Sequence, residues 1–282
     1  MTGGRAEVRS ADGTTIGYRR LGSGPAVLLL HGGMLSSQHF SKLAAALSAD
    51  FTVCVPDRRG RGLSGPHGDG FSVSREVEDV RALVAETGAT RVFGLSSGAL
   101  VALRTALVTP ALERIALYEP PLSVGGSVPV GWLARFDREV AAGRSASALV
   151  TGMKGLAAEP SLFSRVPRFA LVPLLAVGAR LQREGAPEEV SVEQLIPTLH
   201  FDLRIVGELA DTAEDYAGVT APVLLLGGSR SAGYLRLALA KLADVLPHAR
   251  RVELKGAGHS GPEDDGVPLA VARELRGFFA TT

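Results

Sequence analysis

The sequence predicts an α/β fold with a mostly parallel eight-stranded sheet, helices on both faces and a helical cap insertion. In residues 1–121, short apolar runs alternate with longer segments of helical periodicity, which is typical of a parallel sheet covered by helices. Residues 122–218 contain helical segments and no good strands, and the strand pattern returns within residues 219–282. We therefore expect a discontinuous core, 1–121 with 219–282, and a cap, 122–218.

The individual elements follow from hydrophobic periodicity and from turn residues. An alternating stretch with an Asp-Gly turn predicts a β-hairpin over residues 6–21. Short apolar runs predict strands at 26–30, 51–55, 91–95, 114–118, 222–228 and 250–254. Helical spacing predicts core helices at 74–86, 99–108, 235–246 and 269–279, and cap helices at 132–142, 146–156, 168–183 and 192–209.

Composition excludes several classes of protein. Thirty basic and 29 acidic residues in a chain of 282 give a formal charge of +1, so nothing points to nucleic acid or an anionic membrane as a partner. The most apolar run, 169–177, is too short to span a bilayer and predicts a buried helix. The start of the chain lacks a signal-peptide pattern, and the single cysteine, Cys54, is expected in the core. Both features favour a cytoplasmic location, and the oligomeric state stays open.

A nucleophile motif stands between a predicted strand and a predicted helix. The pentapeptide 94–98 reads Gly-Leu-Ser-Ser-Gly, and with 34 glycines in the chain such a pattern alone is weak evidence. Its context strengthens it, because the strand 91–93 precedes it directly and the helix 99–108 follows. Flanking glycines permit the sharp turn that would expose the Ser96 hydroxyl at the carboxyl edge of the sheet. Ser96 is therefore the expected nucleophile.

A serine hydroxyl needs a base that takes its proton. His259 lies in the glycine-rich loop 256–261 just past the last predicted strand, where an imidazole can reach Ser96. His31 also follows a strand, but as the start of His-Gly-Gly-Met it belongs to a loop with another expected role. The remaining histidines are expected to be structural or on the surface: His39, His67, His200 and His248.

The oxyanion formed by attack on a carbonyl needs two aimed N–H donors. One is expected to be the backbone N–H of Ser97, the residue after the nucleophile. The second is expected from the loop that follows the strand 26–30, at Gly33 or at Met34.

Four segments together resemble the α/β-hydrolase superfamily, in its serine-nucleophile, cap-bearing, esterase-like branch. They are His-Gly-Gly at 31–33, Asp-Arg-Arg-Gly-Arg-Gly-Leu-Ser at 57–64, the pentapeptide 94–98 and Gly-His at 258–259. Their order and approximate spacing match the family from about residue 12 to residue 279. The resemblance implies the fold and the nucleophile, whereas the segment 57–64 looks like the family's structural turn and implies no chemistry.

The chain departs from this family where the third member of a catalytic triad is expected. In most relatives an aspartate follows the penultimate strand, about 28 residues before the histidine, and fixes the tautomer of that histidine. Here the corresponding loop, 227–233, contains no acid, and Asp244 falls late in a helix.

Glu119 is the best replacement for the missing acid. It ends the strand 114–118 and precedes two prolines that force the chain out of the sheet, and some hydrolases of this superfamily resemble this arrangement. Two alternatives stay open. Glu119 could instead cap a helix or pair with an arginine of the cap, and the reaction could run on a Ser–His dyad assisted by Ser229, Ser231 or water.

The cap supplies many apolar side chains, of which some should line the roof of a pocket. We expect Met34, Trp132 and Phe136 to contact the substrate. An apolar roof favours an uncharged ester, lactone or thioester of medium size over a sugar or a phosphorylated metabolite. No metal-binding or nucleotide-binding spacing occurs, so no cofactor is expected.

Three functions are compatible with these residues. The first is a serine hydrolase that cleaves a carboxylic ester, lactone or thioester through an acyl-enzyme on Ser96, with His259 and Glu119 completing the triad. The second is an enzyme of specialised metabolism that cyclises or releases chains without hydrolysis. The third is a receptor-like protein that binds a small molecule with little turnover, against which the intact Ser96 and His259 argue.

Overall fold

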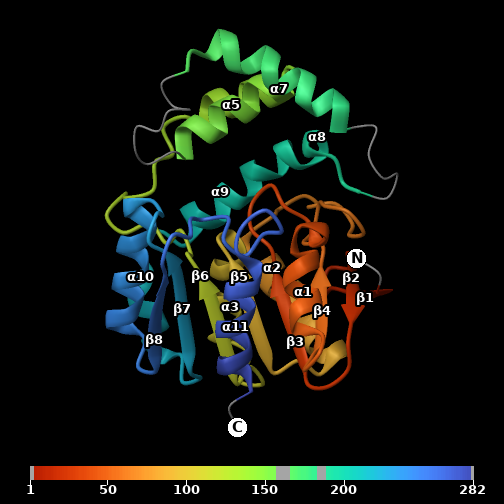
Figure 1. Cartoon of the computed structure of the whole chain (residues 1–282), viewed down its shortest axis with the longest axis vertical. Coiled ribbons are helices and arrows are strands. Elements are labelled where there is room, and N and C mark those ends of the chain that lie inside the picture. The colour runs from red at the N-terminus through yellow and green to blue at the C-terminus, as the bar shows by residue number, and fades with distance from the viewer. Residues whose placement is uncertain (1–2, 157–165, 183–188, 281–282) are drawn as a thin grey trace.

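The computed structural model describes residues 3–156, 166–182 and 189–280, and it confirms the predicted α/β fold (Figure 1). Its described strands form an eight-stranded sheet in the order β1-β2-β4-β3-β5-β6-β7-β8. Neighbours from β4 to β8 run parallel, whereas β1, β2 and β4 pair antiparallel at one edge. The strands are β1 (Gly4–Arg9), β2 (Thr15–Leu21), β3 (Ala26–Leu30), β4 (Thr52–Pro56), β5 (Arg91–Leu95), β6 (Arg114–Tyr118), β7 (Val223–Gly228) and β8 (Ala249–Leu254).

Helices cover both faces of this sheet, because side chains of the central strands alternate between two apolar layers. In β3, Val27 and Leu29 face one layer and Leu28 and Leu30 face the other, and all four are fully buried. The first layer is completed by α1 (Ser41–Leu47), which follows the 3₁₀ helix η1 (Ser37–Phe40), and by α11 (Pro268–Phe279). The second layer is completed by α2 (Val73–Thr87), α3 (Ser97–Ala106) and α10 (Gly233–Val245).

A helical insertion between β6 and β7 lies over the end of the sheet at which the parallel strands terminate (Figure 1). In that view α9 crosses directly above the strands, with α5 and α7 above it. The described elements of the insertion are α4 (Leu133–Ala141), α5 (Ser145–Leu156), α7 (Arg168–Gln182), α8 (Val192–Leu195), η2 (Ile196–Thr198), α9 (Leu199–Glu208) and η3 (Ala213–Gly218).

Two expectations for the insertion are wrong. The single helix expected over 192–209 is divided into α8, η2 and α9, because Pro197 lacks the N–H that a continuous α-helix needs. The apolar run 169–177 lies in α7, but it is not a buried helix, since Phe169 is 81% exposed and Leu174 is 67% exposed. Helix α7 packs against α5, and within its described side chains Leu171 is buried, whereas Phe169 and Leu174 lie on the surface.

Two further points concern expectations outside the insertion. Cys54 lies fully buried in the core, as expected, and burial raises the pKa of its thiol to about 11. No helix among the described residues is long and apolar enough to cross a membrane.

Candidate active site

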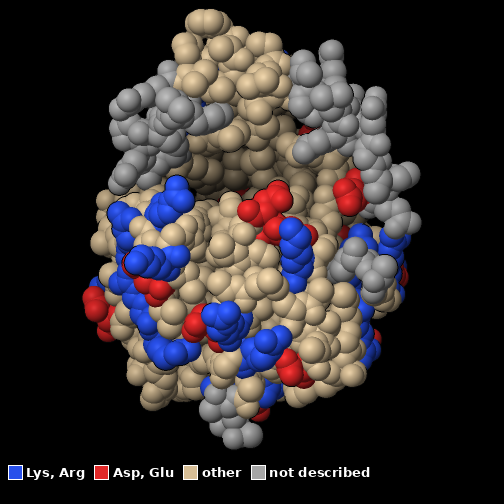
Figure 2. Space-filling model, in the orientation of Figure 1, with Lys and Arg blue, Asp and Glu red and all other residues tan. Residues whose placement is uncertain are grey.

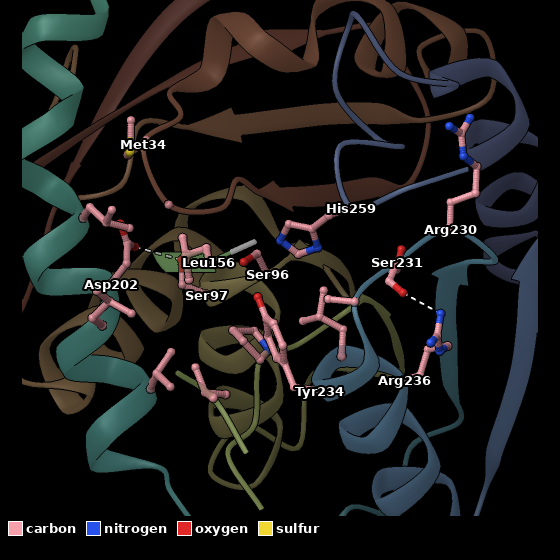
Figure 3. A pocket seen from close by; sticks show the side chains of 18 of the residues that line it. Met34, Ser96, Ser97, Leu156, Asp202, Arg230, Ser231, Tyr234, Arg236 and His259 are labelled. Carbon is pink, nitrogen blue, oxygen red and sulfur yellow. Dashed lines mark hydrogen bonds between the residues drawn. The ribbon is translucent and has the colours of Figure 1, made fainter. Parts of the chain in front are cut away.

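Ser96 lies in the sharp turn between β5 and α3. Its backbone has φ 55° and ψ −124°, in the left-handed region that costs a non-glycine residue about 1–3 kcal/mol. The turn is held in register because the Ser96 N–H donates to the carbonyl of Tyr118, the last residue of β6, at 2.9 Å. This strained turn carries the Ser96 side chain out of the sheet and into the wall of a cavity (Figure 3).

His259 and Glu119, 140 residues apart, form a hydrogen-bonded pair behind Ser96. The distance from His259 Nδ1 to Glu119 Oε2 is 2.7 Å, and since an ionised carboxylate only accepts, Nδ1 is the donor. The other oxygen, Oε1, accepts from the Gly228 N–H at 2.6 Å. Ser96 lies beside the His259 ring (Figure 3), so the remaining nitrogen, Nε2, is the one left to interact with its hydroxyl.

The Glu119 carboxylate is positioned by strain and burial. Its side chain is fully buried and its φ is 47°, a second left-handed non-glycine residue at this site. Such a conformation persists only where the surroundings enforce it, here through the bond from its N–H to the Leu226 carbonyl at 3.0 Å and the two bonds of its carboxylate. Both carboxylate oxygens are thus engaged, and among the described residues Glu119 neither caps a helix nor pairs with an arginine.

The residues expected to donate to an oxyanion also meet at this cavity. Ser97 is the first residue of α3, and the first N–H groups of a helix have no acceptor within that helix. Gly33 and Met34 line the same wall, and Met34 has φ 55°. A Cβ on Gly33 would lie 3.1 Å from the Asp202 carboxylate, so this close approach between loop and insertion favours glycine.

The cavity has a volume of about 620 Å³ and lies between the sheet edge and the insertion, where the space-filling view is hollowed (Figure 2). Besides Met34, its apolar lining comprises Pro121, Val128, Leu156, Leu199, Leu203, Val206, Ala232 and Leu235. Besides the residues above, polar side chains come from Asp202, Ser229, Arg230, Ser231, Tyr234 and Arg236. Burial, with a smaller effect of the Glu119 charge, raises the pKa of Tyr234 to about 12, so this phenol stays neutral.

Trp132 and Phe136, expected in the roof, do not line this cavity. Phe136 is fully buried in a small core of the insertion, where it packs behind the cavity-lining Leu199 and Leu203. Trp132 packs edge-to-face on Phe136, with ring centroids 5.9 Å apart, and its Nε1–H donates to the Pro129 carbonyl at 2.8 Å. Both aromatic rings therefore support the wall from behind, and of the three expected contacts only Met34 faces the cavity.

A buried ionic cluster joins the insertion to the core beside Ser96. Asp202 of α9 lies 3.0 Å from Arg58 and 2.6 Å from Arg61, and the Ser97 hydroxyl donates to it at 2.8 Å. Arg58 also pairs with Glu76 at 2.9 Å. The sequence reasoning missed this cluster, although the three arginines in the turn 57–64 were a usable signal, because buried cations require acidic partners.

Electrostatics fix the charge states in this cluster. Burial alone would raise the pKa of Asp202, but the charges of Arg61 and Arg58 hold it below its usual value. Burial lowers the pKa of His31 well below its usual value, with help from Arg61 and Arg58. The His31 ring is neutral, since Nε2 accepts from the Arg58 N–H at 3.1 Å while Nδ1 lies 3.0 Å from the Gly32 carbonyl. Its two nitrogens are thus occupied, and it offers no base to the cavity.

Replacement of Gly98 by alanine should destabilise the fold by about 1–3 kcal/mol or more. A Cβ at Gly98 would collide with the carbonyl oxygen of His31 and lie 2.6 Å from that of Leu30, both rigid backbone atoms. The check is the free energy of unfolding from urea titration. Gly207→Ala in α9 is the matched control, since its Cβ would meet nothing within 4 Å and should stabilise the helix by up to about 1 kcal/mol. Equal effects of the two substitutions would contradict the packing around Gly98.

Among the residues that the structure describes, no group of three or more His, Cys, Asp or Glu side chains is arranged to hold a metal ion.

Similar proteins include several hydrolases. A 2-(acetamidomethylene)succinate hydrolase of Mesorhizobium japonicum is 29% identical over 249 residues, which cover 87% of this chain and 85% of that protein. A crystal structure of an alpha/beta hydrolase from Sphaerobacter thermophilus is 32% identical, covers 98% of this chain and 100% of that one, and superposes with a TM-score of 0.79. The crystal structure of an enol-lactonase from Burkholderia xenovorans shares the fold. It is 21% identical, covers 98% of this chain and 100% of that one, and superposes with a TM-score of 0.72.

A match to a protein family agrees with the fold. The model of the alpha/beta hydrolase family matches residues 27–274, which is most of the chain. The protein therefore belongs to the alpha/beta hydrolase family.

Proposed function

We propose that the protein is a serine hydrolase that cleaves a carboxylic ester, lactone or thioester through an acyl-enzyme on Ser96. The observation that carries the proposal is the 2.7 Å contact between His259 Nδ1 and the buried Glu119 carboxylate, with Ser96 beside the His259 ring at the cavity (Figure 3). A histidine held in this way presents an unprotonated Nε2 to a serine hydroxyl, which is the arrangement that nucleophilic catalysis needs.

The reaction would proceed in two halves. His259 Nε2 takes the proton of Ser96 as Oγ attacks the carbonyl carbon, and the oxyanion accepts hydrogen bonds from the N–H groups of Ser97 and of Gly33 or Met34. His259 then passes the proton to the leaving oxygen or sulfur, which departs and leaves the acyl group on Ser96. In the second half a water molecule gives its proton to His259, attacks the acyl carbon and releases the acid, and Ser96 regains the proton.

The cavity supports a substrate with a substantial apolar part. Its volume of about 620 Å³ is in the range of small-molecule sites, and one wall is formed by the side chains of Leu156, Leu199, Leu203 and Val206. The relatives named above include a 2-(acetamidomethylene)succinate hydrolase and an enol-lactonase, so the family similarity is compatible with more than one kind of acyl bond.

Covalent labelling tests this function. The wild-type protein should react with a fluorophosphonate at one site, with the mass increase on the peptide that contains Ser96, and a short-chain 4-nitrophenyl ester should protect against it. Hydrolysis in ¹⁸O-labelled water should place the label in the released acid. Turnover without solvent oxygen in the product would favour a cyclising or chain-releasing enzyme, and no labelling together with no turnover would favour a binding protein.

A further inference from the structure

The wall of the cavity beyond His259 carries cations that the proposed reaction does not use. Arg230 follows β7, Arg236 lies in the first turns of α10, and both line the cavity. Asp202 and these arginines stand on opposite sides of Ser96 and His259 (Figure 3). The cavity is thus charged differently at its two ends.

The two ends of the cavity differ because the charged side chains are paired with opposite charges at only one of them. The Asp202 carboxylate is paired with Arg58 and Arg61, at 3.0 and 2.6 Å. Within the described part of the chain, neither Arg230 nor Arg236 has an acidic partner within salt-bridge distance. An anion bound beside them would therefore meet two positive charges, of which Arg236 is partly buried and Arg230 is exposed, and neither is paired with an acidic side chain of the described residues.

Hydrogen bonds to backbone carbonyls tie both arginine residues to neighbouring segments. The Arg230 N–H donates to the Ala257 carbonyl at 2.9 Å, and Arg236 Nη1 donates to the Ser231 carbonyl at 2.6 Å. That bond uses one of the five N–H donors of the Arg236 guanidinium and fixes its position against the loop, leaving the other donors for a ligand. An oriented guanidinium is suited to a carboxylate, which it can bind through two parallel hydrogen bonds.

Ser231 adds an unsatisfied polar atom at the same place. Ser231 is 6% exposed as a residue, and its hydroxyl has no hydrogen-bond partner among the described residues. A buried hydroxyl without a partner costs free energy, and such groups in native structures call for an explanation. An acceptor oxygen of a ligand that enters this wall would supply the missing partner.

We propose that Arg230, Arg236 and Ser231 form a subsite for a carboxylate group of the substrate, an inference that rests on the proposed acyl transfer at Ser96. The substrate would then be a monoester, lactone or thioester with an apolar part against the insertion and a free carboxylate against the loop 229–232. This proposal differs from the sequence-based expectation of an uncharged substrate. It also gives a role to the segment Ser-Arg-Ser at 229–231, which follows β7.

The first test compares two esters of equal chain length, 4-nitrophenyl hemiglutarate and 4-nitrophenyl pentanoate. In the wild type, kcat/KM for the hemiglutarate should exceed kcat/KM for the pentanoate at least about tenfold, mainly because KM for the hemiglutarate is lower. Both rates are corrected for the release of 4-nitrophenol that occurs without enzyme. In Arg230→Gln/Arg236→Gln this ratio should fall at least about tenfold. Raising the salt concentration should narrow the wild-type ratio, because Arg230 is exposed and its attraction is screened.

A matched variant controls for the loss of two positive charges. Arg250→Gln/Arg251→Gln removes the same charge from exposed positions on β8 that do not line the cavity, and it should leave the ratio of the two esters unchanged. Equal ratios in the wild type and in both double variants would overturn the carboxylate subsite while leaving ester hydrolysis intact.

The second test is independent of turnover. Monomethyl glutarate is titrated by calorimetry into Ser96→Ala and into Ser96→Ala/Arg230→Gln/Arg236→Gln. We expect the dissociation constant to rise at least about tenfold in the second protein. If neither ester were hydrolysed by the wild type, the proposed reaction would fail, and this titration would still decide the subsite: equal binding by the two proteins, or binding by neither, would refute it.

Discussion

Replacement of Ser96 by alanine is expected to lower kcat for ester hydrolysis about 10⁴- to 10⁶-fold. The substitution removes the only atom that would form the acyl bond, while His259, Glu119 and the backbone donors stay in place. The turn itself should persist, because it is held by the bond from the Ser96 N–H to the Tyr118 carbonyl at 2.9 Å, which alanine retains. The measurement is steady-state hydrolysis of 4-nitrophenyl butyrate, with thermal unfolding to verify that the fold is unchanged.

The adjacent serine provides the control for this experiment. Ser97→Ala removes a hydroxyl that donates to Asp202 at 2.8 Å but keeps the backbone N–H that would bind the oxyanion. Its effect on kcat should therefore be smaller than that of Ser96→Ala by orders of magnitude. If Ser96→Ala kept more than about one per cent of the wild-type rate, or if Ser97→Ala were the more damaging change, Ser96 would not be the nucleophile.

Local sequence patterns were sufficient for the sheet and for the turn that holds Ser96. The pattern 94–98 sits on β5 and α3 as expected, because strand, tight turn and helix are each encoded by neighbouring residues. The pairing of His259 with Glu119 could be suggested only from the absence of an acid in 227–233 and from the strand end at Tyr118. Their contact joins residues 140 positions apart, and a single sequence does not encode such a distance directly.

The sequence did not reveal which side of each helix in the insertion faces the cavity. Trp132 and Phe136 belong to an apolar helix face that packs inside the insertion, whereas other apolar residues of the insertion line the cavity. Hydrophobic periodicity identifies an apolar face, but it cannot decide whether that face meets a ligand or another helix. The same ambiguity made the run 169–177 look buried, although Phe169 is exposed. The ion pairs of Asp202 were missed for a related reason, because its partners lie more than 140 residues away in the turn 57–64.

The second large effect is expected at Glu119. Glu119→Gln should lower kcat about 10²- to 10⁴-fold with little change in KM, because the amide cannot stabilise a protonated His259 and can favour the wrong tautomer of the ring. The substitution conserves the shape of a fully buried side chain, and its amide oxygen can still accept from the Gly228 N–H. The effect should therefore appear in the chemical step, as measured by single-turnover acylation, rather than in binding.

Ser231→Ala separates this triad from a Ser–His dyad assisted by the neighbouring loop. The Ser231 hydroxyl has no hydrogen-bond partner among the described residues, whereas both oxygens of Glu119 are engaged, one of them 2.7 Å from His259. If the triad operates, Ser231→Ala should raise KM for a carboxylate-bearing ester. Acylation of this variant by 4-nitrophenyl butyrate should remain far faster than acylation of Glu119→Gln. A larger loss of acylation rate in Ser231→Ala than in Glu119→Gln would instead assign the supporting role to the loop. In that case the Glu119 carboxylate would have only a structural role, which is to stabilise the strained backbone that follows β6.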